Sequence, residues 1–108
     1  MKSALLIETQ HATVDLLNAI CELQYNHDAR DELQLNSEHL EQLGDLTILL
    51  EELGEIFDSE ADGIHEYWII LSDLHMIALN DRTDGIEDIR YTLSEMTGYL
   101  IDLEDFVN

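Results

Sequence analysis

Apolar residues recur every three or four positions in four stretches of the chain, which is the spacing of one face of an α-helix. The stretches run roughly over 3–26, 38–57, 63–80 and 85–106, with short polar segments between them. The pattern predicts an all-α, four-helix bundle-like single domain over residues 1–108. The residues expected in its core include Leu6, Leu16, Ile20, Leu43, Leu46, Leu50, Ile64, Leu71, Leu74, Ile89, Leu93 and Leu100.

The segments between these stretches contain candidate caps and one charged connection. Short side-chain oxygens that can cap a helix stand at Ser3, Ser37, Asp62 and Asp84. Asp84 and Glu87, three residues apart, have the layout of a capping box. Segment 28–36 is expected to be a loop with one helical turn, in which Leu33 and Leu35 point inward.

The third stretch is apolar on nearly all sides, so most of its surface must be covered. One interpretation is that the neighbouring helices surround it inside the bundle. The other is that some of its apolar residues form a homodimer interface or a docking patch. The residues concerned are Ile69, Ile70, Met76 and Ile77.

The chain is strongly acidic, with 25 Asp and Glu against four Lys and Arg and a net charge of −21. Leu, Ile, Val and Phe still make up 34 of the 108 residues, which is enough for a small core. Such a charge excludes direct binding of nucleic acid through a basic face and disfavours anionic membranes. No apolar run reaches the roughly 18 residues of a spanning helix, and no signal peptide is evident. A cytoplasmic protein with a positively charged partner is expected.

Motifs for metal binding are incomplete. Segment 58–63 resembles the start of an EF-hand loop, but the twelfth loop position, which needs a bidentate Glu, is Ile69. Glu8-x-x-His11 and Asp62-x-x-His65 have a spacing found in di-iron bundles. Glu8 and His11 lie opposite the apolar face of their helix and should meet water. We therefore expect an acidic turn at 58–63, no metal and no cofactor.

Enzyme motifs are also missing, so we expect no catalytic activity. Cys21 is the only cysteine and has no histidine three or four residues away, which favours a packing role and a reducing compartment. No phosphate-binding glycine loop or nucleophile elbow occurs. His27, His39 and His75 are interpreted as structural, hydrogen-bonded residues.

The acidic residues form stripes along three of the expected helices, opposite the apolar faces. Steps of three or four residues place carboxylates ~5 to 6 Å apart along a helix, near the phosphate spacing of a nucleic-acid strand. Ordinary helices mix Glu with Lys, because like charges at these spacings cost ~0.2 to 0.5 kcal/mol per pair. The stripes therefore indicate a selected negative field. They comprise Glu8, Asp15, Glu22, Glu38, Glu41, Asp45, Glu52, Glu55, Asp84, Asp88, Glu95 and Asp102.

In size, acidity, helical content and lack of catalytic motifs, the chain resembles small acidic DNA-mimic proteins of phages and mobile elements. That class includes inhibitors of CRISPR effectors and of restriction enzymes. The resemblance implies an inhibitor that binds the basic nucleic-acid-binding surface of a host defence protein, such as a nuclease, in the host cytoplasm. Two alternatives are an antitoxin-like or regulatory module that binds through the apolar third stretch, and a structural homodimer.

Overall fold

A computed structural model describes residues 2–28, 32–57 and 62–107. Across these residues it has four α-helices and no strand, so the predicted all-α four-helix architecture is confirmed. The prediction also placed both ends of every helix within one residue of the observed ends. The helices are α1 (Lys2–Tyr25), α2 (Ser37–Phe57), α3 (Asp62–Asn80) and α4 (Ile86–Val107).

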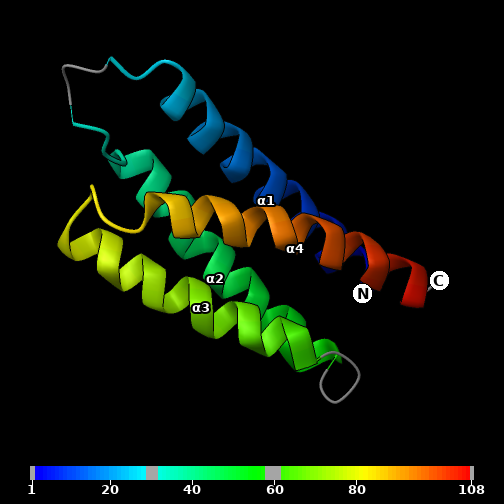
Figure 1. The fold of residues 1–108 in the computed structure, drawn as a ribbon. Coiled ribbons are helices and arrows are strands. Elements are labelled where there is room, and N and C mark those ends of the chain that lie inside the picture. The colour runs from blue at the N-terminus through cyan, green and yellow to red at the C-terminus, as the bar shows by residue number, and fades with distance from the viewer. Residues whose placement is uncertain (1, 29–31, 58–61, 108) are drawn as a thin grey trace.

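Each helix runs antiparallel to the one before it, and the ends of α1 and α4 marked N and C lie close together (Figure 1). α1 packs against both α2 and α4, whereas α3 packs extensively against α2 and over a smaller area against α4. The resulting body measures 48 × 23 × 18 Å. One side of the bundle is therefore formed by α1 and α2, and the opposite side by α3 and α4.

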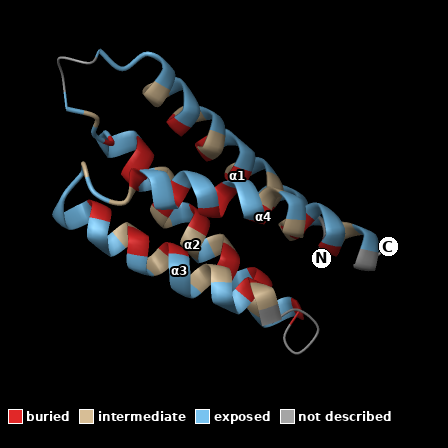
Figure 2. Cartoon of the chain, in the orientation of Figure 1, coloured by how far each residue is buried: buried red, intermediate tan, exposed pale blue. Residues whose placement is uncertain are grey.

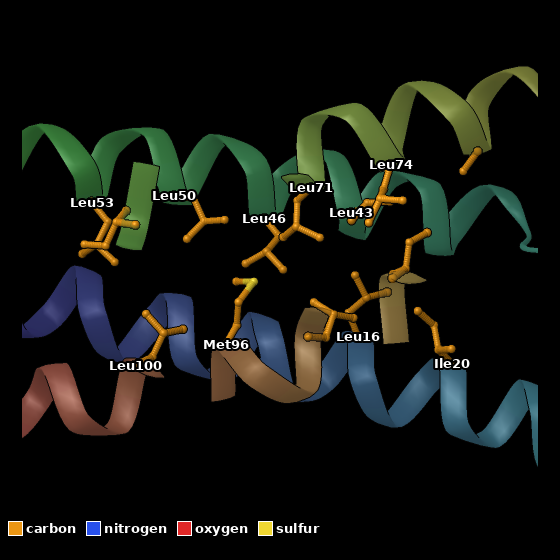
Figure 3. Packing of buried hydrophobic residues seen from close by; sticks show 14 of the residues in the cluster. Leu16, Ile20, Leu43, Leu46, Leu50, Leu53, Leu71, Leu74, Met96 and Leu100 are labelled. Carbon is orange, nitrogen blue, oxygen red and sulfur yellow. The ribbon is translucent and has the colours of Figure 1, made fainter. Parts of the chain in front are cut away.

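The apolar stripes of the four helices meet along the axis of the bundle, and the outer surfaces are exposed (Figure 2). Leu46 on α2, Leu71 on α3 and Met96 on α4 are all 0% exposed, and their side chains point toward the same central region (Figure 3). Burying each side chain of this size contributes about 1.5 to 3 kcal/mol. This burial holds the described helices together.

Buried threonines satisfy their hydroxyl groups within their own helices. Thr13 on α1 and Thr92 on α4 donate to the carbonyl oxygens of Thr9 and Asp88, at 2.7 and 2.8 Å. Thr9 is also fully buried, although the sequence pattern did not place it in the core. Because the hydroxyl donor stays hydrogen-bonded, burying a threonine costs little free energy of folding at positions where the core has room for only a small side chain.

The cap of α2 lies one residue before the predicted Ser37. The backbone N–H of His39 donates to Oδ1 of Asn36 at 2.8 Å, and the N–H of Asn36 donates to Nδ1 of His39 at 3.2 Å. This reciprocal pair is a capping box in which histidine replaces the usual Glu or Gln. The Ser37 hydroxyl instead accepts a hydrogen bond from Arg82 at 3.3 Å.

The predicted capping box of Asp84 and Glu87 is wrong. α4 begins at Ile86, after Gly85 with φ of +78°, and the first helical bond runs from the N–H of Ile89 to the Gly85 carbonyl at 2.9 Å. Glu87 binds Gln24 and Arg90 instead of reaching back to the helix start. The other two candidate caps, Ser3 and Asp62, have side chains outside the described residues.

Residues 32–36, which lead into α2, pack against the bundle. Leu35 is 1% exposed and Leu33 is half-buried, as predicted. The N–H of Leu35 donates to the carbonyl of Arg82 in the α3–α4 connection at 2.9 Å. Residues 32–36 contain no helical turn, and residues 29–31 lie outside the described part of the chain.

Two glycines give opposite predictions for the same substitution. A Cβ on Gly63 would lie 2.7 Å from Cζ of Tyr99, whereas a Cβ on Gly98 would meet open space. We expect Gly63→Ala to lower the free energy of unfolding by about 1 to 3 kcal/mol, because the tyrosine ring must move. Gly98→Ala should raise it by about 0.5 to 1 kcal/mol, because alanine restricts the unfolded chain. Urea denaturation measures both, and equal effects would contradict the close contact.

Candidate functional site

All twelve carboxylates of the predicted stripes occupy exposed positions. On α1, Glu8, Asp15 and Glu22 are spaced by seven residues, which is about 10 Å along the helix. The buried residues of each helix turn inward, so the acids lie on its outer half (Figure 2). The structure divides them into two groups. Although α1 and α4 are neighbours, the acids of α1 and α2 face the edge that α1 and α2 share, whereas those of α4 turn toward α3.

The larger group, which we name the α1/α2 band, covers the side formed by α1 and α2. Its α1 members lie between the outermost line of that helix and the edge that meets α2, as follows from the rotation of 100° per residue. A groove of about 600 Å³ between the two helices brings Glu22 and Glu38 to one opening, together with Asp28 and Glu32 of the connection. The band comprises Glu8, Asp15, Glu22, Glu38, Glu41, Asp45, Glu52 and Glu55.

The smaller group, the α4 band, lies toward α3 on the opposite side of the molecule. Burial raises the pKa of the Tyr67 phenol on α3, and the nearby carboxylates of Glu95 and Glu66 raise it further. Glu95 thus lies close to α3 and far from the α1/α2 band. The predicted stripes therefore do not form one continuous surface. The α4 band comprises Asp84, Asp88, Glu95 and Asp102.

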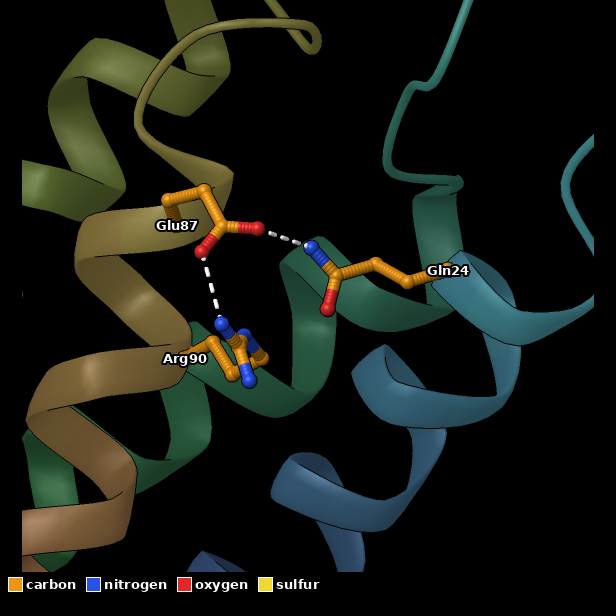
Figure 4. Close-up of polar contacts among 3 residues, drawn as sticks. All are labelled: Gln24, Glu87 and Arg90. Carbon is orange, nitrogen blue, oxygen red and sulfur yellow. Dashed lines mark hydrogen bonds and ion pairs between the residues drawn. The ribbon is translucent and has the colours of Figure 1, made fainter. Parts of the chain in front are cut away.

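Of the four basic residues, the structure describes the side chains of Arg82 and Arg90. Arg90 donates to Glu87 at 2.8 Å, and Gln24 on α1 donates to the other oxygen of the same carboxylate (Figure 4). The hydrogen bonds from Arg90 and Gln24 hold the pKa of Glu87 below its usual range. Within the described residues, no carboxylate of the α1/α2 band forms an ion pair.

His39 lies in the wall of the groove between α1 and α2, beside Glu38. The side chain is 9% exposed, and its Nδ1 accepts the N–H of Asn36. Burial lowers the pKa of the imidazole, and the carboxylate of Glu38 offsets part of that effect. His39 is therefore the structural, hydrogen-bonded residue that the sequence predicted, and its neutral form is the one that caps α2.

The lowered pKa of His39 predicts a specific pH dependence. The unfolded chain binds the proton at its ordinary pKa near 6.5, while the folded protein binds it only at lower pH. The stabilising contribution is therefore complete above about pH 6.5 and is lost as the pH falls through that value toward the folded-state pKa. His39→Gln keeps an acceptor at the cap without a titrating group. Urea denaturation at pH 7.5 and 5.5 should show wild type losing more stability than this variant, and parallel losses would contradict the assignment.

The candidate metal ligands are not brought together. Glu8 and His11 are exposed on α1, as predicted. Residues 58–61 of the EF-hand-like segment lie outside the described residues. Within the described ranges, no three His, Cys, Asp or Glu side chains are grouped as a metal site requires.

The sequence interpretation singled out three further residues, Cys21, His75 and His27. Cys21 is exposed and therefore does not serve as the predicted packing residue. His75 is half-buried against α2, where a Cβ on Gly44 would lie 3.1 Å from its Cε1. The missing side chain at Gly44 is what lets α3 approach α2 at this level. His27 is exposed at the end of α1.

The neighbouring helices do not surround α3. Ile69, Ile70 and Ile77 are 41 to 43% exposed and Met76 is 69% exposed, so the interpretation of α3 as a covered central helix is wrong. The apolar residues divide between the α2 side and the α4 side of the exposed surface. None of the described helices is long and apolar enough to cross a membrane.

Sequence reasoning also missed several exposed apolar residues, and Ile48 is one of them. Ile48 on α2 is 55% exposed, although it lies among Glu41, Asp45 and Glu52 on the outer face. An isoleucine inside an acidic stripe was the signal that could have found it.

Comparison with models of protein families, with curated proteins and with solved structures found no match to this chain.

Proposed function

We propose that the protein is a nucleic-acid-mimicking inhibitor, of the anti-CRISPR or antirestriction type, that binds the basic nucleic-acid-binding surface of a host defence protein. The observation that carries the proposal is the α1/α2 band, whose eight exposed carboxylates form no ion pair with any described side chain. On an ordinary bundle surface, cations interspersed at helical spacing would cancel much of this field.

The geometry of the band supports binding in a groove made for a phosphate backbone. Its carboxylates repeat along two neighbouring rigid helices, so they are held in place before a partner arrives. Fixed charges bind with less loss of conformational entropy than charges on a mobile tail. Lysine and arginine side chains of a partner would meet two adjacent rows, as they meet the two strands of a duplex.

The proposal also accounts for how such a protein finds its target. A negative field of several charges steers a basic partner toward the band and raises the association rate at low ionic strength. Salt at 0.15 M reduces the range of this field to about 8 Å, so the final contacts still need close approach of the band. The protein itself would bind no nucleic acid, because the two molecules repel one another.

A competition experiment tests this function. The immobilised protein is incubated with a bacterial lysate treated with nuclease, and bound proteins are eluted with a DNA duplex at constant salt. We expect the captured proteins to bind nucleic acid and to leave the column with the duplex, because both ligands use one site. Captured proteins that stay bound at saturating duplex, or that bind no nucleic acid, would refute mimicry.

A further inference from the structure

The outer surface between α2 and α3 carries an apolar groove of about 440 Å³, whose aliphatic residues the proposed function does not use. Gly44 and His75 face one another across the two helices, and Ile48 and Leu79 also line the groove. Ile48 is 55% exposed and Leu79 is 58% exposed. Large aliphatic side chains are thus presented to solvent at the position where a helical bundle ordinarily places polar residues.

The exposed apolar surface continues along α3 beyond the groove itself. Met76 is 69% exposed and Ile69 is 42% exposed, and their separation of seven residues keeps them on one face, about 10 Å apart. We use the name α2/α3 groove for the groove together with this extension along α3. Its exposed aliphatic residues are Ile48, Ile69, Met76 and Leu79. An elongated apolar surface of this length matches the apolar face of a helix with anchors at positions i, i+3 or i+4, and i+7.

Carboxylates border this surface on both sides. Glu41 and Asp45 line the groove on the α2 side, and Asp73 lies on α3 within one turn of both Ile69 and Met76. All three are exposed, and none is paired with a described side chain. The surface is therefore an apolar strip with a negative border, which is a more specific pattern than either an apolar patch or an acidic face.

We propose that the α2/α3 groove binds a basic amphipathic helix of a partner protein. Its apolar residues would contact Ile48, Met76 and Leu79, and flanking lysines or arginines would pair with the bordering carboxylates. Charge complementarity selects this occupant. A second copy of the chain would bring its own acidic border against the first, and an anionic lipid surface would be repelled.

This binding site goes beyond the proposed function, because it uses exposed aliphatic residues that mimicry of a phosphate backbone does not need. Its border shares Glu41 and Asp45 with the α1/α2 band. A protein groove that binds nucleic acid presents cations but no apolar helix face. The α1/α2 band and the α2/α3 groove therefore serve two parts of one target or two separate partners. Loss of either interaction would leave the other measurable. Variants at the aliphatic residues therefore test the groove without changing the α1 carboxylates.

The test uses a fluorescent peptide of about 18 residues, or five helical turns, with leucines along one face and lysines and arginines beside them. Fluorescence anisotropy measures its affinity for the wild-type protein and for Ile48→Glu, Met76→Glu and Ile101→Glu. Ile101 is the matched control, because it is 53% exposed on α4 and its substitution changes the charge equally. A scrambled peptide of the same composition controls for charge alone. Circular dichroism confirms that each variant is folded.

We expect Ile48→Glu and Met76→Glu to weaken binding of the amphipathic peptide at least tenfold, while Ile101→Glu changes it less than twofold. The scrambled peptide should bind at least tenfold more weakly than the amphipathic one. Isoleucine methyl NMR should show peptide-dependent shifts at Ile48 and Ile69 and none at Ile101. Equal weakening by all three variants, equal binding of both peptides, or self-association that Met76→Glu abolishes would overturn the proposal.

Discussion

Reversing the three carboxylates of α1 is expected to weaken binding to the basic partner by at least ~100-fold, or about 2.7 kcal/mol. Glu8→Lys, Asp15→Lys and Glu22→Lys replace three attractions by three repulsions within the α1/α2 band. A like charge placed against a basic groove costs several kcal/mol in total, even after screening by salt. Titration calorimetry or surface plasmon resonance with the partner captured by duplex-eluted affinity chromatography measures this loss.

The α4 band supplies a charge-matched control. Asp88→Lys, Glu95→Lys and Asp102→Lys have the same seven-residue spacing, and each triple raises the net charge from −21 to −15. These residues lie on the opposite side of the bundle, so we expect less than a tenfold loss, caused by the weaker long-range field alone. Equal losses for the two triples would mean that the carboxylates supply only a general field and that the α1/α2 band is not the binding surface.

The largest expected effect on stability comes from the centre of the core. Leu46→Ala should lower the free energy of unfolding by about 2 to 5 kcal/mol, because the vacated space is enclosed by side chains of the other helices. Leu46 is 0% exposed, and Leu71 and Met96 point toward the same region (Figure 3). The free energy of unfolding of a small domain is about 5 to 15 kcal/mol in all, so this single change removes a large part of it. Urea denaturation followed by circular dichroism measures it.

A control on the same helix separates packing from helix propensity. Ile48→Ala lies two residues from Leu46 but removes a side chain that is 55% exposed. It should change the free energy of unfolding by less than about 1 kcal/mol, because alanine also favours the helix. A comparable loss at both positions would contradict the central place of Leu46.

The helices were predictable because the signal for them is local. Leu43, Leu46 and Leu50 recur at three and four residues, and nothing in the chain interrupts that period. The capping of α4 was not predictable in the same way. The carboxylate of Glu87 is bound by Gln24, which is 63 residues away in sequence. A tertiary contact therefore takes the group that a local capping box would have used.

The candidate site was predictable in its residues and not in its arrangement. The twelve carboxylates lie opposite the apolar face of each helix in the sequence pattern, and all twelve are exposed in the structure, as predicted. Their division into two bands depends on which helices are neighbours, and periodicity carries no information on this. The exposure of Ile48 and Cys21 was missed for a related reason, since a helical wheel shows the core direction of one helix but not how far its neighbours extend over it.

The backbone hydrogen bond from Leu35 to Arg82 ties the α1–α2 connection to the α3–α4 connection at one end of the bundle. Residues 32–36 and 81–85 cannot move apart without breaking this bond and exposing the buried side chain of Leu35. The two segments therefore open as one cooperative unit. The acidic groove beside α1 and the turn that leads into α4 share this unit, so a partner that rigidifies one of them slows local unfolding of the other.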